Sequence, residues 1–209
     1  GQRKRAGHKR DLRLPCKTPH EGSQPNDRRM RQKGKRNMQD RYGRTIEYMR
    51  VSVTDRCNLR CVYCMPPEGV ESIPHSEILT FDEIERVCRI GARLGITRIR
   101  LTGGEPLARR NLPELLGRIK KLEGIEQVAL TTNGILLSDY INELVSAGMD
   151  GVNISIDTLD EKKYRDLTRG GCIEKALQGL EAALSYPQLN VKVNCVPLDD
   201  GGGKDWVAL

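Results

Sequence analysis

Three cysteines lie within the short segment CNLRCVYC, at Cys57, Cys61 and Cys64. Three thiolates at this spacing can bind three corners of an iron-sulfur cube and leave the fourth iron without a protein ligand. Ligation by four cysteines completes a cluster that transfers electrons, whereas an iron that lacks one protein ligand can bind a small chelating molecule. The segment therefore predicts a metal centre that carries out chemistry on a bound reactant.

Structural zinc is the main alternative for these cysteines. Zinc sites usually pair two C-x2-C units, or combine one such unit with histidines at comparable spacing. The nearest candidates outside the segment are His75 and Cys88, and neither completes such a pattern. Buried thiols without any metal are a second alternative. The chain has seven cysteines, an odd number, which favours metal binding in a reducing compartment over a disulfide framework.

The C-x3-C-x2-C pattern, with Tyr63 just before its last cysteine, resembles the signature of the radical S-adenosylmethionine (SAM) enzymes. The match extends to DRYGRTIEYMRVSVTDRCNLRCVYCMP at 40–66, LTGGEPL at 101–107, LTTNG at 130–134 and NISIDTL at 153–159. These segments occur in the order found in the GTP 3',8-cyclase family of molybdenum cofactor biosynthesis. The resemblance covers about residues 38–198.

The resemblance implies an activity, its cofactors and its partners. It implies a radical SAM lyase that converts GTP to (8S)-3',8-cyclo-7,8-dihydroguanosine 5'-triphosphate. A [4Fe-4S] cluster would be held by the catalytic cysteines, and SAM would bind its open iron. The implied partners are GTP as substrate, an electron donor of the flavodoxin or ferredoxin type, and cyclic pyranopterin monophosphate synthase as the pathway partner.

The resemblance also implies four SAM contacts, at Tyr63, Gly104, Glu105 and Ser155. The residue types support two of these roles. Glycine at 104 removes the Cβ that would keep the backbone away from a ligand, and the Glu105 carboxylate can accept hydrogen bonds from an ammonium group. A GGE triplet alone is a common turn. Its position after a strand that itself follows the cysteine segment makes a ligand contact the better interpretation.

Beyond residue 45, short β-branched runs alternate with helical periodicity, which is typical of βα units around a parallel sheet. We expect strands at 47–53, 97–102, 126–132, 150–156 and 190–195. Helices are expected after Thr80, Asn111 and Ser138 and from Ile173, and Thr80 with Glu83 matches a capping box. The family resemblance makes this α/β pattern a partial (β/α)6 TIM-like barrel, truncated here after about five strands.

The five expected strands are apolar on one face and polar on the other. Valines such as Val191 and Val193 lie on the apolar face, which is suited to packing under helices. Parallel strands covered on both faces normally read as continuous apolar runs. A polar face repeated over five strands therefore predicts a water-accessible barrel interior. For any single residue of this face, an ordinary solvated surface is the alternative.

Three cations fall on the expected inner face, at Arg50, Arg100 and Lys192. Unpaired buried cations are costly, and a triphosphate would neutralise them, with arginine supplying forked donors and lysine a point charge. The family resemblance places the GTP triphosphate on the same three residues, with Thr131 nearby. The alternative is pairing within the protein, with the carboxylates of Asp55, Glu105 or Asp157.

The net charge of +7 is unevenly distributed. Residues 1–41 contain 14 Lys and Arg against 4 Asp and Glu, so residues 42–209 carry a net charge of −3. Residues 1–37 are polar and rich in charge, and we expect them to be a disordered extension outside the barrel domain at 38–209. They contain no aromatic residue, and readers of single-stranded nucleic acid normally add aromatic stacking to positive charge. No nucleic-acid partner is therefore expected.

No apolar run reaches the roughly 18 residues of a membrane span, and the N-terminus lacks the apolar core of a signal peptide. We therefore expect a cytoplasmic protein without a membrane partner. The sequence leaves open whether the chain forms a homodimer. The family carries a second [4Fe-4S] cluster on C-terminal cysteines for which this chain has no matching ligands, so we expect an N-terminal portion that is inactive alone.

Two other functions compete with this interpretation. The first is another radical SAM enzyme, one that modifies a peptide or a haem precursor and shares the cysteine and GGE motifs. The second is a non-catalytic module that binds metal or RNA through the cysteine segment and the basic residues near the N-terminus. GTP-dependent cleavage of SAM separates the cyclase from the first rival, and iron-sulfur loading separates it from the second.

Overall fold

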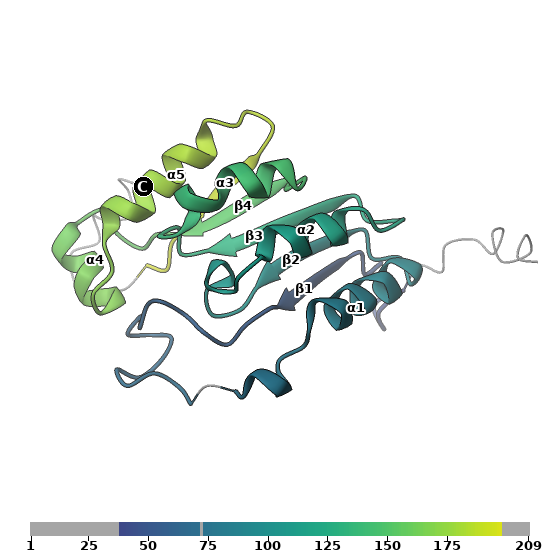
Figure 1. The fold of residues 1–209 in the computed structure, drawn as a ribbon, viewed down its shortest axis with the longest axis horizontal. Helices are drawn as coiled ribbons and strands as arrows, with labels where there is room; N and C mark the ends of the chain where they lie inside the picture. Colours follow the sequence, from purple (N-terminus) through teal and green to yellow (C-terminus); the bar gives the residue numbers. More distant parts are fainter. Residues whose placement is uncertain (1–37, 72, 198–209) are drawn as a thin grey trace, which may run out of the picture. The chain divides into compact units, whose positions relative to one another are not determined.

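The computed structural model describes residues 38–71 and 73–197. The expectations for residues 1–37 and for the chain from 198 onward lie outside the described residues and remain predictions. The described residues form one α/β unit in which five parallel strands alternate with helices (Figure 1).

The sheet runs in the order β1-β2-β3-β4-β5, and every neighbouring pair is parallel. The strands are β1 (Tyr48–Ser52), β2 (Arg98–Thr102), β3 (Gln127–Thr132), β4 (Gly151–Ser155) and β5 (Asn190–Asn194). Each lies within one residue of the expected bounds, which confirms the period-2 interpretation of the sequence. The register places Arg50 beside Arg100 and Asn153 beside Lys192. Polar side chains of neighbouring strands therefore share one face.

The helices lie between successive strands in the chain. They are α1 (Phe81–Arg93), α2 (Leu112–Lys120), α3 (Leu137–Ser146), α4 (Glu161–Thr168) and α5 (Ile173–Leu184), with short 3-10 turns η2 (His75–Glu77) and η3 (Pro106–Ala108). The capping box at the start of α1 is confirmed, because Thr80 Oγ1 accepts from the Glu83 N–H while the Glu83 carboxylate accepts from the Thr80 N–H.

Two expected helix starts differ from the structure. Asn111 does precede α2, but it has a left-handed φ of 59° and its side chain makes no cap hydrogen bond. Ser138 lies inside the first turn of α3, which follows Leu136. The sequence did not predict α4, which has few apolar residues. Its start is fixed by Asp160, whose Oδ1 accepts a hydrogen bond from the Lys163 N–H at 2.6 Å.

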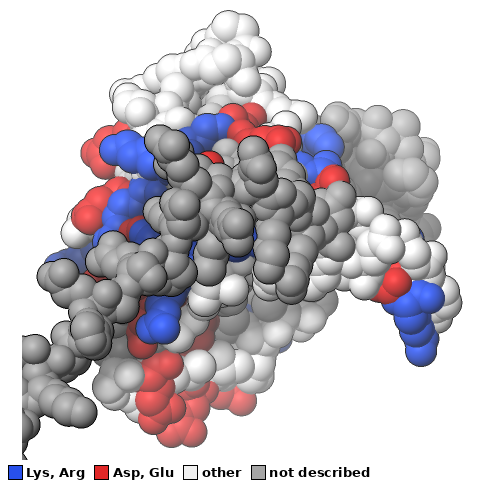
Figure 2. All heavy atoms as spheres, turned by 90° about the vertical axis from the view of Figure 1, so that its right-hand side faces the viewer, with Lys and Arg blue, Asp and Glu red and all other residues white. Residues whose placement is uncertain are grey.

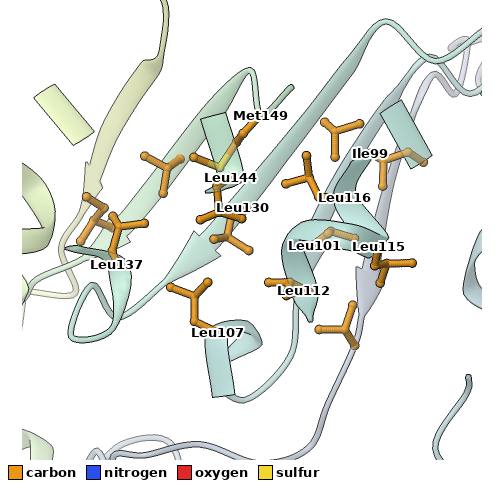
Figure 3. Packing of buried hydrophobic residues seen from close by; sticks show 14 of the residues in the cluster. Ile99, Leu101, Leu107, Leu112, Leu115, Leu116, Leu130, Leu137, Leu144 and Met149 are labelled. Carbon is orange, nitrogen blue, oxygen red and sulfur yellow. The ribbon is translucent and has the colours of Figure 1, made fainter. Parts of the chain in front are cut away.

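The core lies between the helices and the apolar face of the sheet (Figure 3). Strand residues such as Leu101 and Leu130 are buried against helix residues such as Leu116 and Leu144, all with no exposed surface. The expectation for Val193 is wrong, because 39 % of it is exposed. It belongs to β5, which has a neighbouring strand on one side only within the described sheet.

The surface of the described residues carries both signs of charge. Figure 2 shows Lys and Arg side chains interspersed with Asp and Glu. Some of these charges pair across elements: Arg118 of α2 bonds to Glu85 of α1 at 2.7 Å, and Lys120 bonds to Asp150 at 2.7 Å. Within the described ranges, no helix is long and apolar enough to cross a membrane.

Candidate functional site

The cysteine loop, residues 57–64, follows β1 and is held by the end of α4. The Arg60 N–H donates to the Thr168 carbonyl at 3.1 Å. Arg169, which ends α4 with a left-handed φ of 53°, donates from Nη1 to the Arg60 carbonyl at 3.0 Å and the Met65 carbonyl at 2.7 Å. The unpredicted helix therefore supports both the middle and the end of the cysteine loop.

The three thiols are free and accessible to different degrees. Cys57 and Cys61 are half-buried, and Cys64 is exposed. Burial raises the pKa of Cys57, and it raises the pKa of Cys61 to about 11, so both are neutral thiols in the absence of metal. The charge of a coordinated iron deprotonates such a thiol outright. In the described ranges, no three His, Cys, Asp or Glu side chains converge on a single metal ion. In an iron-sulfur cluster each thiolate binds a different iron, so its cysteines need not converge on a single metal ion.

Hydrogen-bond donors already surround the loop. The Leu59 N–H lies 3.4 Å from Cys57 Sγ, and Asn133 Nδ2 lies 3.9 Å from the same sulfur. Tyr164 is 2 % exposed, and its hydroxyl has no hydrogen-bond partner among the described residues. Burial raises the pKa of Tyr164, and negative charge at Cys61 adds to the rise. Donors aimed at cysteine sulfur and a buried hydroxyl without an acceptor both suit an anionic iron-sulfur cluster. The residues therefore fit the expected cluster.

The GGE turn packs against the backbone that leads into the cysteine loop. The Gly104 N–H donates to the Thr54 carbonyl at 2.8 Å, and the Glu105 N–H donates to the Arg56 carbonyl at 2.7 Å. A Cβ at Gly103 would come within 2.4 Å of the Thr54 oxygen, and one at Gly104 within 2.3 Å of the Arg56 oxygen. Glycine is therefore required here by the protein's own backbone, a reason that the sequence alone did not reveal.

Glu105 is the buried centre of this turn, with no exposed surface. Its Oε1 accepts from the Leu107 N–H at 3.0 Å and from Thr132 Oγ1 at 2.8 Å, and its Oε2 accepts from the Asn133 N–H at 2.8 Å. Burial raises the pKa of Glu105, and the three hydrogen bonds oppose that rise. Because a carboxylate offers about four acceptor positions, one remains for a ligand ammonium group.

The pKa of Glu105 leads to a pH-dependent prediction for Thr132→Val. The Thr132 hydrogen bond lowers this pKa, so its loss raises the pKa of Glu105 in the folded state further above the ordinary value of a glutamate. A raised carboxyl pKa costs stability as pH rises through that range. We expect Thr132→Val to lower the free energy of unfolding by about 1.5–3 kcal/mol at neutral pH and by less below pH 4.5.

Denaturant unfolding at the two pH values measures this effect. Thr158→Val is the matched control, because Thr158 is also buried and its Oγ1 accepts from the Asp160 N–H at 3.1 Å without contacting a carboxylate. Its cost should not change with pH. Equal pH dependence in the two variants would show that Thr132 does not stabilise an ionised Glu105.

Tyr63 and Ser155 lie near the same end of the sheet. The Tyr63 hydroxyl donates to Asp157 Oδ2 at 2.5 Å, and Asp157 Oδ1 accepts from the Val196 N–H at 2.9 Å. Ser155 is the last residue of β4 and lies beside Asn194 of β5. Burial and the bond to Asp157 raise the pKa of Tyr63. Asp157 thereby links the cysteine loop to the ends of β4 and β5.

A cavity of about 290 Å³ lies on the polar face, nearer the start of the strands. Arg100 and Lys192 line it, as the sequence predicted for a polyanion site, together with Tyr48 and Arg98. Arg50 does not line the cavity itself. Thr131 does not line it either, and its hydroxyl is buried without a hydrogen-bond partner in the described structure. A larger hollow of about 740 Å³ at the starts of α1 and α2 contains none of the predicted site residues.

The cations of the inner face have no carboxylate partner. Arg50, Arg100 and Lys192 form no ion pair within residues 38–71 and 73–197. The three carboxylates considered as internal partners bond elsewhere: Asp55 to the Ile73 N–H, Glu105 within its turn and Asp157 to Tyr63. The described structure therefore does not contain the internal ion pairs that the sequence left open.

The sequence assigned no site role to three residues of this region. Tyr48 and Arg98 line the cavity, and strand alternation from Arg50 and Arg100 would have placed both on the polar face. Asn133 donates to the Glu105 carboxylate through its N–H and to Asn58 Oδ1 through Nδ2 at 2.7 Å. No pattern in the sequence indicates that Asn133 joins the GGE turn to the cysteine loop.

Comparison with known proteins gives closely similar sequences. The GTP 3',8-cyclase of Pelotomaculum thermopropionicum is 54 % identical over 159 residues, which are 76 % of this chain and 49 % of that protein. The GTP 3',8-cyclase of Heliobacterium modesticaldum is 51 % identical over 168 residues, 80 % of this chain and 51 % of that protein. These relatives confirm the resemblance seen in the sequence. The chain spans about half the length of the curated relatives it matches.

Solved structures share the fold at lower identity. Methylornithine synthase gives a TM-score of 0.58 at 19 % identity, over 71 % of this chain and 44 % of that one. The structure of anSMEcpe with bound AdoMet gives 0.55 at 18 % identity, over 71 % of this chain and 41 % of that one. The family model described as Radical SAM superfamily matches residues 51–205, from β1 through the cysteine loop, the GGE turn and β5. The chain therefore belongs to the radical SAM superfamily.

Proposed function

We propose that this chain forms the SAM-binding part of a lyase that converts GTP to (8S)-3',8-cyclo-7,8-dihydroguanosine 5'-triphosphate. One observation carries the proposal: a cysteine loop and a GGE turn at the C-terminal ends of the strands share a sheet with cations on its polar face that form no ion pair within the described residues. The similar proteins named GTP 3',8-cyclase support it. The family implies a [4Fe-4S] cluster and SAM. The structure of anSMEcpe, which has this fold, contains bound AdoMet, which is SAM.

Cys57, Cys61 and Cys64 would hold the cluster. When bound, cluster and SAM together supply a 5'-deoxyadenosyl radical that removes a hydrogen atom from the substrate. This chain's own residues would then bind and orient SAM. We assign the SAM contacts to Tyr63, Gly104, Glu105 and Ser155, with the remaining acceptor position of Glu105 available to the SAM ammonium group. Burial of Glu105 keeps water from competing for that position.

Arg50, Arg100 and Lys192 would hold the GTP triphosphate. Their positive charges have no carboxylate partner in the part of the chain that the structure describes, and the cavity beside Arg100 and Lys192 provides space for an anion. Thr131 supplies a further hydroxyl that has no hydrogen-bond partner among the described residues. The parallel strands run from these cations toward the GGE turn and the cysteine loop. The ribose would therefore lie nearer the SAM site than the triphosphate does, with its 3' carbon closing onto C8 of guanine after hydrogen removal.

The remaining assignments follow from this reaction. An electron donor of the flavodoxin or ferredoxin type would reduce the cluster, and cyclic pyranopterin monophosphate synthase would take over the cyclised nucleotide. The described residues provide ligands for one cluster, and the family's second cluster would need ligands from elsewhere. We also propose a cytoplasmic location. A homodimer is compatible with the sequence but has no support in the described residues.

GTP deuterated at the ribose 3' carbon tests the reaction. The anaerobically reconstituted chain is given SAM, dithionite and this substrate, and 5'-deoxyadenosine is analysed for deuterium. We expect slow, GTP-dependent deuterium transfer and no cyclised product, because displacement of the ribose by about 1 Å can cost on the order of a hundredfold in rate when the base is not fixed. Cleavage of SAM at the same rate without GTP, and without deuterium transfer, would favour a different radical SAM substrate.

A further inference from the structure

Tyr48 connects the two arginines of the polar face. Its hydroxyl oxygen accepts a hydrogen bond from Arg50 Nε at 3.2 Å and another from Arg100 Nε at 2.9 Å. Tyr48 and Arg50 belong to β1 and Arg100 to β2, and the register places the two arginines directly beside each other. Tyr48 also lines the cavity of about 290 Å³ on this face. One phenol therefore bridges two strands at the edge of the cavity.

This arrangement places like charges side by side. Like charges at directly paired positions of neighbouring strands destabilise a sheet. Neither Arg50 nor Arg100 has a carboxylate within ion-pair distance in the described ranges. The neutral hydroxyl of Tyr48 satisfies one donor of each guanidinium but neutralises no charge. The pair therefore keeps its full positive charge for an anion.

The Nε contacts also fix how the guanidinium groups are presented. Arginine has five donors in a planar fork, and anchoring Nε leaves the four terminal N–H groups. Arg100 uses one of these with the Leu130 carbonyl, from Nη1 at 3.3 Å. The contact with Tyr48 restricts both guanidinium groups. Their remaining terminal donors are therefore less mobile than they would be at the ends of two unrestrained side chains. Restricting such side chains before binding lowers the entropy cost of holding a ligand.

We propose that Tyr48 is a positioning residue that sets the guanidinium groups of Arg50 and Arg100 for the phosphate chain of the substrate. The proposal rests on the proposed function, because it takes the ligand of these arginines to be a triphosphate. With both acceptor positions of its oxygen used, the Tyr48 O–H is left to donate a hydrogen bond to the same anion. A tyrosine with only a structural role would act independently of the arginines, whereas the effect of Tyr48 on anion binding depends on Arg50 and Arg100.

Tyr48→Phe tests this role by removing one oxygen. Isothermal titration calorimetry of the full chain with inorganic tripolyphosphate and with GTP measures affinity. We expect about tenfold weaker binding of both ligands, since hydrogen bonds to charged groups are lost or misdirected. Tyr42→Phe is the matched control: Tyr42 is 68 % exposed, lies beside the guanidinium of Arg41 at 4.8 Å, and is outside the cavity. Its affinities should equal those of the unmodified chain.

A double-mutant cycle with Arg100→Ala separates positioning from stability. If Tyr48 acts through the arginines, Tyr48→Phe should cost much less in the Arg100→Ala background than in the unmodified chain. The midpoint of denaturant unfolding should not change in Tyr48→Phe, because Tyr48 is 41 % exposed. A fully additive cycle, or unchanged tripolyphosphate affinity in Tyr48→Phe while Arg100→Ala weakens it, would overturn the role of Tyr48. Unchanged affinity in Arg100→Ala itself would instead overturn the proposed triphosphate site, and the proposal for Tyr48 with it.

Discussion

Replacing Cys61 by alanine is expected to abolish iron-sulfur loading of the anaerobically reconstituted protein. The unmodified chain should bind about four irons and four sulfides. The variant leaves two thiolates, so a second iron loses its protein ligand. The loop itself should persist, because its internal bonds use the Cys61 carbonyl, which accepts from the Cys64 N–H at 2.9 Å, and not the thiol. Iron and sulfide analysis, with electron paramagnetic resonance of the reduced protein, measures the loss. Alanine at Cys57 or Cys64 should have the same effect.

Cys88→Ala is the control for this experiment. Cys88 is a buried thiol with no exposed surface, on the core side of α1, and burial, with a smaller contribution from the charge of Glu85, raises its pKa to about 11. Its replacement should lower thermal stability because it removes a packed sulfur atom, yet leave the iron content unchanged. Full iron content in Cys61→Ala would contradict the assignment of the cluster ligands. Zinc instead of iron after anaerobic isolation would contradict it as well.

Alanine at Arg100 or Lys192 is expected to weaken GTP binding by about tenfold or more, since each charge-assisted contact is worth roughly 1.5–3 kcal/mol. The effect should be large because both cations line the cavity and neither has an internal partner in the described ranges. Affinity is measured by calorimetry at one fixed ionic strength, because the binding of a polyanion depends strongly on salt.

Lys175→Ala is the matched control for Lys192→Ala. Lys175 is an exposed lysine of α5, which packs on the apolar side of the sheet, so the change removes the same charge without touching the cavity. Its GTP affinity should be unchanged. If all of these variants bound GTP as tightly as the unmodified chain does, the nucleotide assignment would fail. A radical SAM enzyme with another substrate would then be the better interpretation.

Several features were predictable from local patterns. The five strands and their polar face follow from alternation with period 2, and the start of α1 follows from Thr80 and Glu83. Cys88, which completes no metal-binding pattern in the sequence, is fully buried. These features depend on residues that lie close together in the chain, so the sequence contains the relevant information directly.

Other features arise between segments that are distant in the chain. Arg169 donates a hydrogen bond to the carbonyl of Arg60 in the cysteine loop, 109 residues away in the sequence. Asn133 reaches both Glu105 and Asn58. Such contacts depend on the positions of at least two elements at once, and no local periodicity encodes them. The same is true of α4, whose apolar face is small and whose end supports the cysteine loop.

The sequence by itself predicted the cluster ligands and located the GGE turn and the cations of the inner face, because residue type and spacing suffice for those predictions. Only the tertiary structure decided what each of them contacts. It showed that Gly104 is required by the Arg56 carbonyl and that Glu105 is buried with three donors. It also placed the Tyr48 hydroxyl between Arg50 and Arg100. Strand alternation fixes which face a side chain occupies, but the register between strands and the reach of long side chains decide its partners.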